Sequence, residues 1–301
     1  MQKYEVRRDF ITKYNNEFGT DNGLEFDMFD MSNFGGNGAD KPATGISWNE
    51  AARFVNWLNT STGGYAAYNF TTGGVNDNIS FWTPSDTEDY DPDNPFRSKR
   101  ANYALPSRDE WHKAVFFDSG SLGTTHEYSY GTFGQYHYFS VQPGDTPPIQ
   151  TSGSTDYGTA VYGGTTIGSP PPLSGPADVD NAGGLQDYGT MGMAGNAAEW
   201  NEGPSAQYFN GTYDLPINSP TQTRDLRGGW WNQTGIGNQN FTVNARGNFD
   251  QVPTFDMGPC TGFGVVGGLN SSSGGGTLPE PSSFTIMLTG ACLLGFRRSR
   301  R

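Results

Sequence analysis

The residues best suited to chemistry lie in one glycine-rich stretch, residues 189–200, with the sequence GTMGMAGNAAEW. Gly192 and Gly195 allow positive φ angles without a steric penalty. Asn196 and Glu199 can then turn inward, with the following tryptophan packed behind them. An amide and a carboxylate held in this way either close a buried polar network or give oxygen ligands to a hard cation such as calcium. The stretch predicts a pinned loop, and both roles stay open.

A second distinctive segment is the turn at residues 227–231, with the sequence RGGWW. Aromatic and amide side chains near this turn can form the floor of a ligand site, because indoles stack on sugar faces and amides bond hydroxyl groups. The candidate ligand-binding residues are Trp230, Trp231, Asn232, Gln233 and Arg246. Core packing is the alternative role for the same side chains, and the sequence does not separate the two.

The three histidines do not form a metal motif. His112, His126 and His137 show no ligand spacing and have no paired Asp or Cys nearby. We interpret them as packing or surface residues.

Residues 65–103 indicate a hairpin interrupted by an acidic insertion at residues 85–95. Three aspartates alternate in this insertion, as in an EF-hand calcium loop. Asn94 stands where that loop requires glycine, however, and Arg100 stands where it requires a bidentate glutamate. The pattern therefore favours a solvated acidic loop.

Two helices must position these segments, and each is marked by a capping box. Ser47 with Glu50 forms the first box, and Ser107 with Glu110 forms the second. Apolar residues follow at helical spacing: Ala51, Phe54, Val55 and Leu58 in the first helix, and Trp111, Ala114 and Val115 in the second. The 43 glycines and 19 prolines indicate much irregular structure around them. Helices in such a background predict an α+β fold.

Net charge and cysteine positions argue against nucleic-acid binding and against a disulfide bond. The net charge is −13, and residues 1–276 alone carry −16 because four arginines and one glutamate lie in residues 277–301. Such an acidic body without a basic stripe is not expected to bind nucleic acid. Cys260 lies in the body and Cys292 in an apolar tail, so no disulfide between them is predicted.

Six short blocks follow one another in the order found in the formylglycine-generating enzyme, or sulfatase-modifying factor, family. They are Tyr4-Glu5-Val6, Lys41-Pro42 with Ile46-Ser47-Trp48-Asn49-Glu50-Ala51, Leu105-Pro106-Ser107-Arg108-Asp109-Glu110-Trp111, Gly195-Asn196 with Glu199-Trp200, Leu226-Arg227-Gly228-Gly229, and Gly262-Phe263. The chain thus resembles this family over residues 1–267. The resemblance implies a variant of the C-type lectin fold, a loop-rich α+β architecture with two main helices and short antiparallel strands.

The family oxidises a cysteine of a sulfatase to formylglycine and uses two cysteines, shortly after the Arg-Gly-Gly turn, to hold copper. Cuprous ions require such soft ligands. This sequence has Gln233 and Asn238 at the approximate positions, and Cys260 comes too late. Gly264 is a further departure, because an arginine normally follows the Gly-Phe pair. The resemblance therefore implies neither copper binding nor formylglycine-generating activity.

The family also has calcium sites, and one of them resembles the stretch at residues 189–200. The positions that carry over are Gly195, Asn196, Ala197 and Glu199, through the glutamate carboxylate and nearby backbone carbonyls. Gly192 stands where the family usually has Asp or Asn. One missing oxygen ligand weakens such a site, so the resemblance leaves calcium as a possible cofactor and not an expected one.

The C-terminus has a different composition. Residues 268–276 form a Gly/Ser linker, and residues 277–301 carry a Pro-Glu-Pro motif, an apolar run at 284–296 and a closing arginine cluster. This tail resembles a PEP-CTERM sorting signal, which implies an exported bacterial protein and removal of the tail by an exosortase-type sorting protease. Membrane contact would then occur only through the tail before processing. A simple C-terminal membrane anchor is the alternative.

Exported proteins carry a signal peptide, and the first residues show none. Because the first family block begins at Tyr4, we expect the true start to lie upstream.

Two hypotheses for function follow. The first is an exported, non-catalytic binding module at the cell surface or in the extracellular matrix, whose ligand is a glycan or another exported protein. The second is a divergent formylglycine-generating-type oxidoreductase that acts on a protein cysteine.

Overall fold

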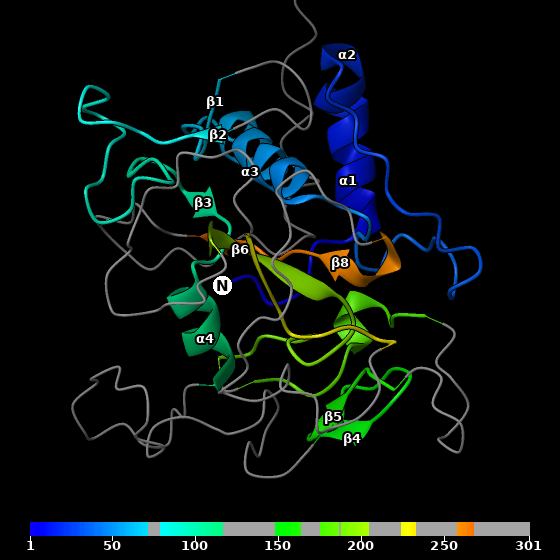
Figure 1. Cartoon of the computed structure of the whole chain (residues 1–301). Coiled ribbons are helices and arrows are strands. Elements are labelled where there is room, and N and C mark those ends of the chain that lie inside the picture. Colours follow the sequence, from blue (N-terminus) through cyan, green and yellow to red (C-terminus); the bar gives the residue numbers. More distant parts are fainter. Residues whose placement is uncertain are drawn as a thin grey trace, which may run out of the picture.

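The computed structural model describes residues 1–71, 79–116, 148–163, 175–186, 188–204, 224–232 and 258–267. These residues form a loop-rich α+β fold with short elements, as expected (Figure 1). The helices are α1 (Arg8–Tyr14), η1 (Asn15–Gly19), α2 (Thr20–Asn22), α3 (Trp48–Ser61), α4 (Arg108–Phe116), η4 (Val179–Asn181) and η6 (Gly258–Cys260). The strands are β1 (Asn69–Phe70), β2 (Ile79–Ser80), β3 (Tyr103–Ala104), β4 (Ile149–Gln150), β5 (Thr159–Ala160), β6 (Ala198–Pro204), β7 (Arg224–Arg227), β8 (Thr261–Gly262) and β9 (Val266–Gly267).

Both predicted helices are present and begin at their capping boxes. At α3 the Glu50 amide donates to Ser47 Oγ (3.3 Å), and the Ser47 amide donates to Glu50 Oε2 (2.7 Å). The same pair of bonds joins Ser107 and Glu110 at α4, at 3.2 and 2.7 Å. The first turn of each helix is therefore closed by its own side chains.

Strand pairing joins segments that lie far apart in the sequence. The largest sheet among the described residues has the order β7-β6-β8, in which β6 pairs antiparallel with β7 and parallel with β8. The predicted antiparallel pairing is confirmed for β1–β2, β3–β9 and β6–β7, whereas β4 and β5 pair in parallel. The structure thus adds two parallel pairs to the predicted strands.

The predicted hairpin at residues 65–103 is only partly right. β1 and β2 pair as a hairpin, but the acidic segment follows β2, and β3 pairs with β9. The carboxylate of Asp89 accepts two bonds from Arg100, at 3.1 and 2.9 Å, and Arg100 also donates to Glu88. The arginine at the position where an EF-hand has glutamate therefore neutralises a carboxylate that a cation would need.

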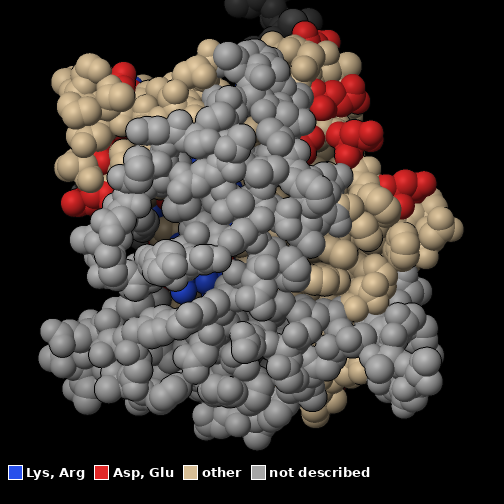
Figure 2. Space-filling model, viewed as in Figure 1, with Lys and Arg blue, Asp and Glu red and all other residues tan. Residues whose placement is uncertain are grey.

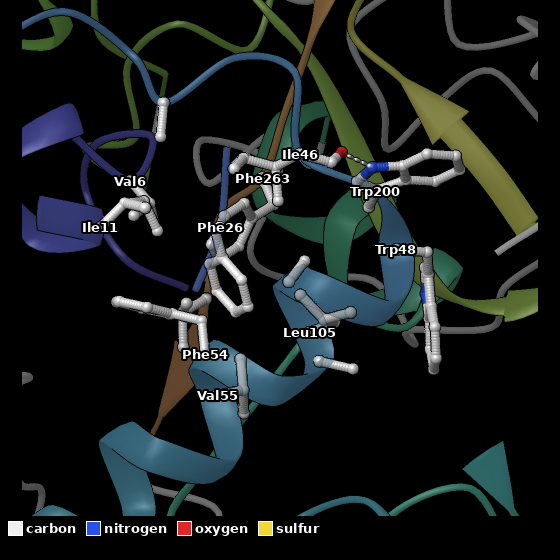
Figure 3. Packing of buried hydrophobic residues seen from close by; sticks show 14 of the residues in the cluster. Val6, Ile11, Phe26, Ile46, Trp48, Phe54, Val55, Leu105, Trp200 and Phe263 are labelled. Carbon is white, nitrogen blue, oxygen red and sulfur yellow. Dashed lines mark hydrogen bonds between the residues drawn. The ribbon is translucent and has the colours of Figure 1, made fainter. Parts of the chain in front are cut away.

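The core is built from aromatic side chains whose polar atoms find backbone partners. Trp48 and Trp200 are fully buried, and their indole nitrogens donate to Asn201 O (2.9 Å) and Ile46 O (2.8 Å), respectively (Figure 3). Phe263, after β8, packs edge-on against the ring of Phe54 in α3. The core therefore lies between α3 and the β6 sheet.

The first and last described segments of the chain are hydrogen-bonded to each other. The Gln2 amide donates to Val265 O (2.7 Å), and the Val6 amide donates to Phe263 O (2.9 Å). The Ala43 amide donates to Val6 O on the other side (2.8 Å). An extended N-terminal segment is thus held between two later parts of the chain.

His112 is buried on α4 and packs against the Phe116 ring, which agrees with a packing role. His126 and His137 lie outside the described residues. No helix in the described part of the chain is both long and apolar enough to cross a membrane.

Candidate functional site

The loop before β6 is held in a conformation that few residues can adopt. Gly195 has φ of 91°, and a Cβ there would lie 2.0 Å from the carbonyl oxygen of Val161. Asn196 follows with φ of 59° and is the only non-glycine residue with positive φ among those described. The Gly195 and Asn196 amides donate to Gly228 O (2.7 Å) and Val161 O (2.8 Å). The predicted pinned loop is confirmed.

Asn196 is the centre of a buried polar network. Its Nδ2 donates to Glu5 Oε2 (2.5 Å), and its Oδ1 accepts from the Ala177 amide (2.8 Å). Its carbonyl oxygen accepts from the Trp231 amide (3.0 Å). The Ala197 amide donates to the second oxygen of Glu5 (2.8 Å). One residue therefore ties together four separate segments of the chain.

Glu5 is the residue of this network whose role the sequence did not predict. It is 1% exposed, and both of its oxygens accept bonds from the 196–197 loop. Burial and then the nearby Glu199 raise the pKa of Glu5 well above its usual range, although the bonds from Asn196 and Ala197 oppose the rise. A glutamate between two apolar positions in the first block was the only local signal.

Glu199 lies at the start of β6 and is fully buried. Its Oε2 accepts from the indole nitrogen of Trp111 in α4 (2.7 Å), whereas its Oε1 has no hydrogen-bond partner among the described residues. Burial raises the pKa of Glu199 to about 8, and the bond from Trp111 opposes this rise. The carboxyl group is therefore held mainly as a neutral acid at neutral pH.

Gly264 explains why Glu199 has an unpaired oxygen. A Cβ built on Gly264 would lie 2.8 Å from Glu199 Oε1 and 3.4 Å from Met1 Cε. A side chain at position 264 would therefore start beside the free carboxylate oxygen. Glycine there leaves Glu199 without a cationic neighbour from this position.

The predicted ligand-binding residues are placed in different environments. Trp231 is 3% exposed, packs against Phe34 and donates from its indole nitrogen to Pro259 O (3.2 Å). Trp230 is half-buried against the main core, and Asn232 is exposed. Gln233 and Arg246 lie outside the described residues. The structure thus brings Trp231 into the core and leaves Trp230 and Asn232 at its edge.

The strand that leads into this turn is anchored by two buried arginines. Arg227 donates from Nε to Asp225 Oδ2 (2.7 Å). The guanidinium of Arg224 lies 4.5 Å from the centre of the Trp48 ring, and its Nε and Nη1 have no hydrogen-bond partner within the described ranges. Burial lowers the pKa of Arg224 to about 10, and the nearby Glu202 opposes this change. The aromatic face thus replaces part of the hydration that Arg224 loses.

Comparison with known proteins is consistent with this fold. The profile of the Sulfatase-modifying factor enzyme 1-like domain family matches residues 3–266. The chain belongs to this family. Two solved structures are similar to the sulfatase-modifying-factor-like domain. Treponema denticola variable protein 1 has 19% identity, a TM-score of 0.51, and coverage of 87% of this chain and 81% of its own. CarF has 17% identity, a TM-score of 0.51, and coverage of 88% and 84%. No curated protein matched the sequence.

The calcium ligands implied by the family resemblance can be compared with the geometry of the sulfatase-modifying-factor-like domain. Both oxygens of Asn196 already accept peptide N–H bonds, and Glu199 offers one unpaired oxygen. Calcium takes six to eight oxygen ligands. No cluster of three or more His, Cys, Asp or Glu side chains suited to a metal occurs among the residues described. These residues fit a hydrogen-bonded network better than a calcium cage.

The structure describes only part of the region that corresponds to the copper-binding cysteines of the family. Gln233 and Asn238 lie outside the described residues, and Cys260 is a half-buried cysteine at the end of η6. Its neighbour Pro259 accepts the bond from the Trp231 indole, so the cysteine lies close in sequence to the contact between the turn and η6. Among the described residues, Cys260 is therefore the cysteine nearest in sequence to this contact.

Proposed function

We propose that this sulfatase-modifying-factor-like domain is a non-catalytic binding module. The observation that carries the proposal is chemical: Gln233 and Asn238 stand at the approximate positions of the family's copper-binding cysteines. An amide is a poor ligand for a cuprous ion and cannot act as a thiolate nucleophile. The buried Asn196 network supports the same role, because its polar groups are engaged in holding the loop.

The ligand we propose is a glycan or another exported protein, bound at the surface beside the Arg-Gly-Gly turn. Trp230 and Asn232 retain solvent access in the described part of this surface, and Gln233 and Arg246 belong to the proposed site. An indole stacks on a sugar face, and an amide bonds its hydroxyl groups. Trp231 has a packing role in this proposal.

A copper titration combined with an oxygen-consumption assay tests the absence of catalysis. The full chain is expected to bind copper weakly and to consume no oxygen with a cysteine-containing peptide. A Cys260→Ser variant is the matched control and should behave like the unmodified chain. Tight stoichiometric binding with turnover that the variant loses would favour the alternative, a divergent oxidoreductase acting on a protein cysteine.

A glycan array, read with and without calcium, tests the binding role. Trp230→Ala and Asn232→Ala should each weaken the strongest glycan signal about tenfold, because each removes one stacking or hydrogen-bonding contact. Tyr65→Ala removes another exposed aromatic ring and is the control. Equal loss in all three variants would count against a site at this turn. A calcium-dependent signal would restore the calcium role of Glu199.

We also propose that the protein is exported and reaches the cell envelope or extracellular matrix through its C-terminal tail. The Pro-Glu-Pro motif, the apolar run at 284–296 and the arginine cluster support this proposal. Mass spectrometry of the protein recovered from cells tests it. Loss of the apolar run and the arginines indicates a sorting protease, whereas an intact tail in the membrane fraction indicates a simple anchor.

A further inference from the structure

Four large side chains are exposed on one small part of the molecule. Ile149 is 67% exposed, Tyr157 63%, Tyr188 50% and Leu185 38%. They come from β4, from the turn into β5, and from the segment that follows Gly184. Figure 1 places β4 and β5 at the opposite end of the molecule from α2. We call this set the β4–β5 face.

Backbone contacts bring these segments together. The Ile149 amide donates to Gly158 O (2.8 Å), which places β4 beside the residue after Tyr157. The Gly184 amide donates to Thr159 O (2.9 Å). A Cβ on Gly184 would lie only 3.3 Å from the Cα of Tyr157. The apolar residues of the β4–β5 face therefore belong to neighbouring backbone segments.

The segments that form this region carry acidic residues and no basic ones. The sequence has no Lys or Arg from residue 114 to residue 223, a stretch that contains every segment of the β4–β5 face. Asp156, next to Tyr157, and Asp180, in η4, are exposed, and neither forms an ion pair with another described residue. The cation that does reach this region, Lys41, pairs with Asp178 at 3.1 Å. The complement of such a face is an apolar segment with a cluster of positive charge.

The chain itself carries a segment of that chemistry. Residues 284–296 are apolar, and four of the 18 Lys and Arg residues of the protein lie in residues 297–301. In the view of Figure 2, red carboxylates of the described residues lie at the upper right, near α1 and α2, with smaller groups at the left edge. The tail thus has the densest basic cluster in the sequence.

The length of the linker sets how far the tail can reach from the end of β9. β9 ends at Gly267, so residues 268–283 separate the fold from the apolar run. A flexible Gly/Ser-rich chain of this length has a typical span of roughly 22 Å, and about 50 Å when extended. Tethering also gives an effective concentration on the order of millimolar, so even a weak contact is populated.

We propose that the C-terminal tail, before its removal, docks on the β4–β5 face of its own chain. The apolar run covers Ile149, Tyr157 and Leu185, and the arginines lie beside Asp156 and Asp180. The contact shields the apolar run from water until the run inserts into a membrane or is bound by a sorting protease. This inference goes beyond the binding role proposed above and does not depend on any ligand.

Amide hydrogen exchange of charge-reversal variants tests the proposal. It is measured on the full chain and read at residues 148–160 and 184–190. Replacing Arg297, Arg298, Arg300 and Arg301 by Glu should speed exchange in both segments about fivefold, because the tail is released. Asp156→Lys with Asp180→Lys should do the same. Combining the two sets should restore the slow exchange, since the charges again complement each other.

Asp21→Lys is the matched control, because Asp21 is an exposed carboxylate in α2 without an ion-pair partner among the described residues. It should leave exchange unchanged at both segments. Equal exchange in all variants would overturn the proposal, and so would failure of the combined variant to recover. Protection that grows with protein concentration would also overturn it, because the occupant would then be a second copy of the chain.

Discussion

Glu199 is a carboxyl group whose free oxygen has no basic partner in the described part of the chain, and its ionisation must oppose folding. Its pKa rises from 4.5 to about 8 through burial, so the folded state binds its proton more tightly than the unfolded state does. The contribution to stability is therefore complete below pH 4.5 and is lost as the pH rises toward 8. Glu5 shifts in the same direction, which reinforces the trend.

Replacing Glu199 by Gln should flatten this pH dependence. The shift corresponds to roughly 5 kcal/mol of unfolding free energy across that range, and the neutral amide removes the titration. Urea unfolding at pH 5, 6.5 and 8 provides the measurement. Glu25→Gln, at an exposed glutamate, should keep the slope of the unmodified protein. A Glu199→Gln protein with an unchanged slope would show that another group causes the pH dependence.

Alanine substitutions at Gly195 and Gly63 distinguish the cost of a positive φ from the cost of a steric clash. Gly195→Ala should lower the unfolding free energy by about 3 kcal/mol or more, because its Cβ would lie 2.0 Å from Val161 O. Gly63 has a similar φ of 81° but no atom within 4 Å of a built Cβ. Gly63→Ala should therefore cost only about 1 kcal/mol, from φ alone. Equal losses in thermal unfolding would argue against a special role for the 195–196 loop.

The importance of single residues was only partly predictable from the sequence. The glycines and Asn196 predict a loop with positive φ angles, because these residue types adopt such angles most readily. Glu5 gives no comparable signal, because its partners lie about 190 positions later. Trp231 could be a binding residue or a core residue by sequence, and only its environment distinguishes the two.

At the level of elements, the capping boxes are local signals, and they located both helices. Ser47→Ala should lower the unfolding free energy by about 1 kcal/mol, because the first turn of α3 loses an acceptor for the Glu50 amide. Ser61→Ala, in the last turn of the same helix, is the control and should be neutral or slightly stabilising. Chemical denaturation of both variants checks the difference, and a similar loss in both would contradict the capping assignment.

The strands were much harder to predict, because most are two residues long and take distant partners. β3 pairs with β9 across more than half the chain, so no local pattern could show that it does not belong to the hairpin. The parallel pairing of β6 with β8 likewise joins segments that are distant in the sequence and are not connected by a tight turn. Register of this kind is fixed by the core and not by the strand sequence.

At the scale of the whole molecule, the last described residues are part of the core. Phe263 is fully buried, and its carbonyl accepts the Val6 amide. Ending the chain after residue 257 should therefore abolish cooperative thermal unfolding, because β8, β9 and this aromatic ring are lost. Ending it after residue 276 should leave the melting temperature within about 2 °C of that of the full chain. A large loss in the longer truncation would place part of the domain in residues 277–301.

Because residues 2 and 6 form hydrogen bonds with residues 265 and 263, the fold cannot close before residue 265 has been synthesised. The first segment must wait until residues 263–265 have left the ribosome, and contacts of such long sequence separation also form slowly. The N-terminal segment therefore stays without these partners during most of the synthesis of residues 1–267.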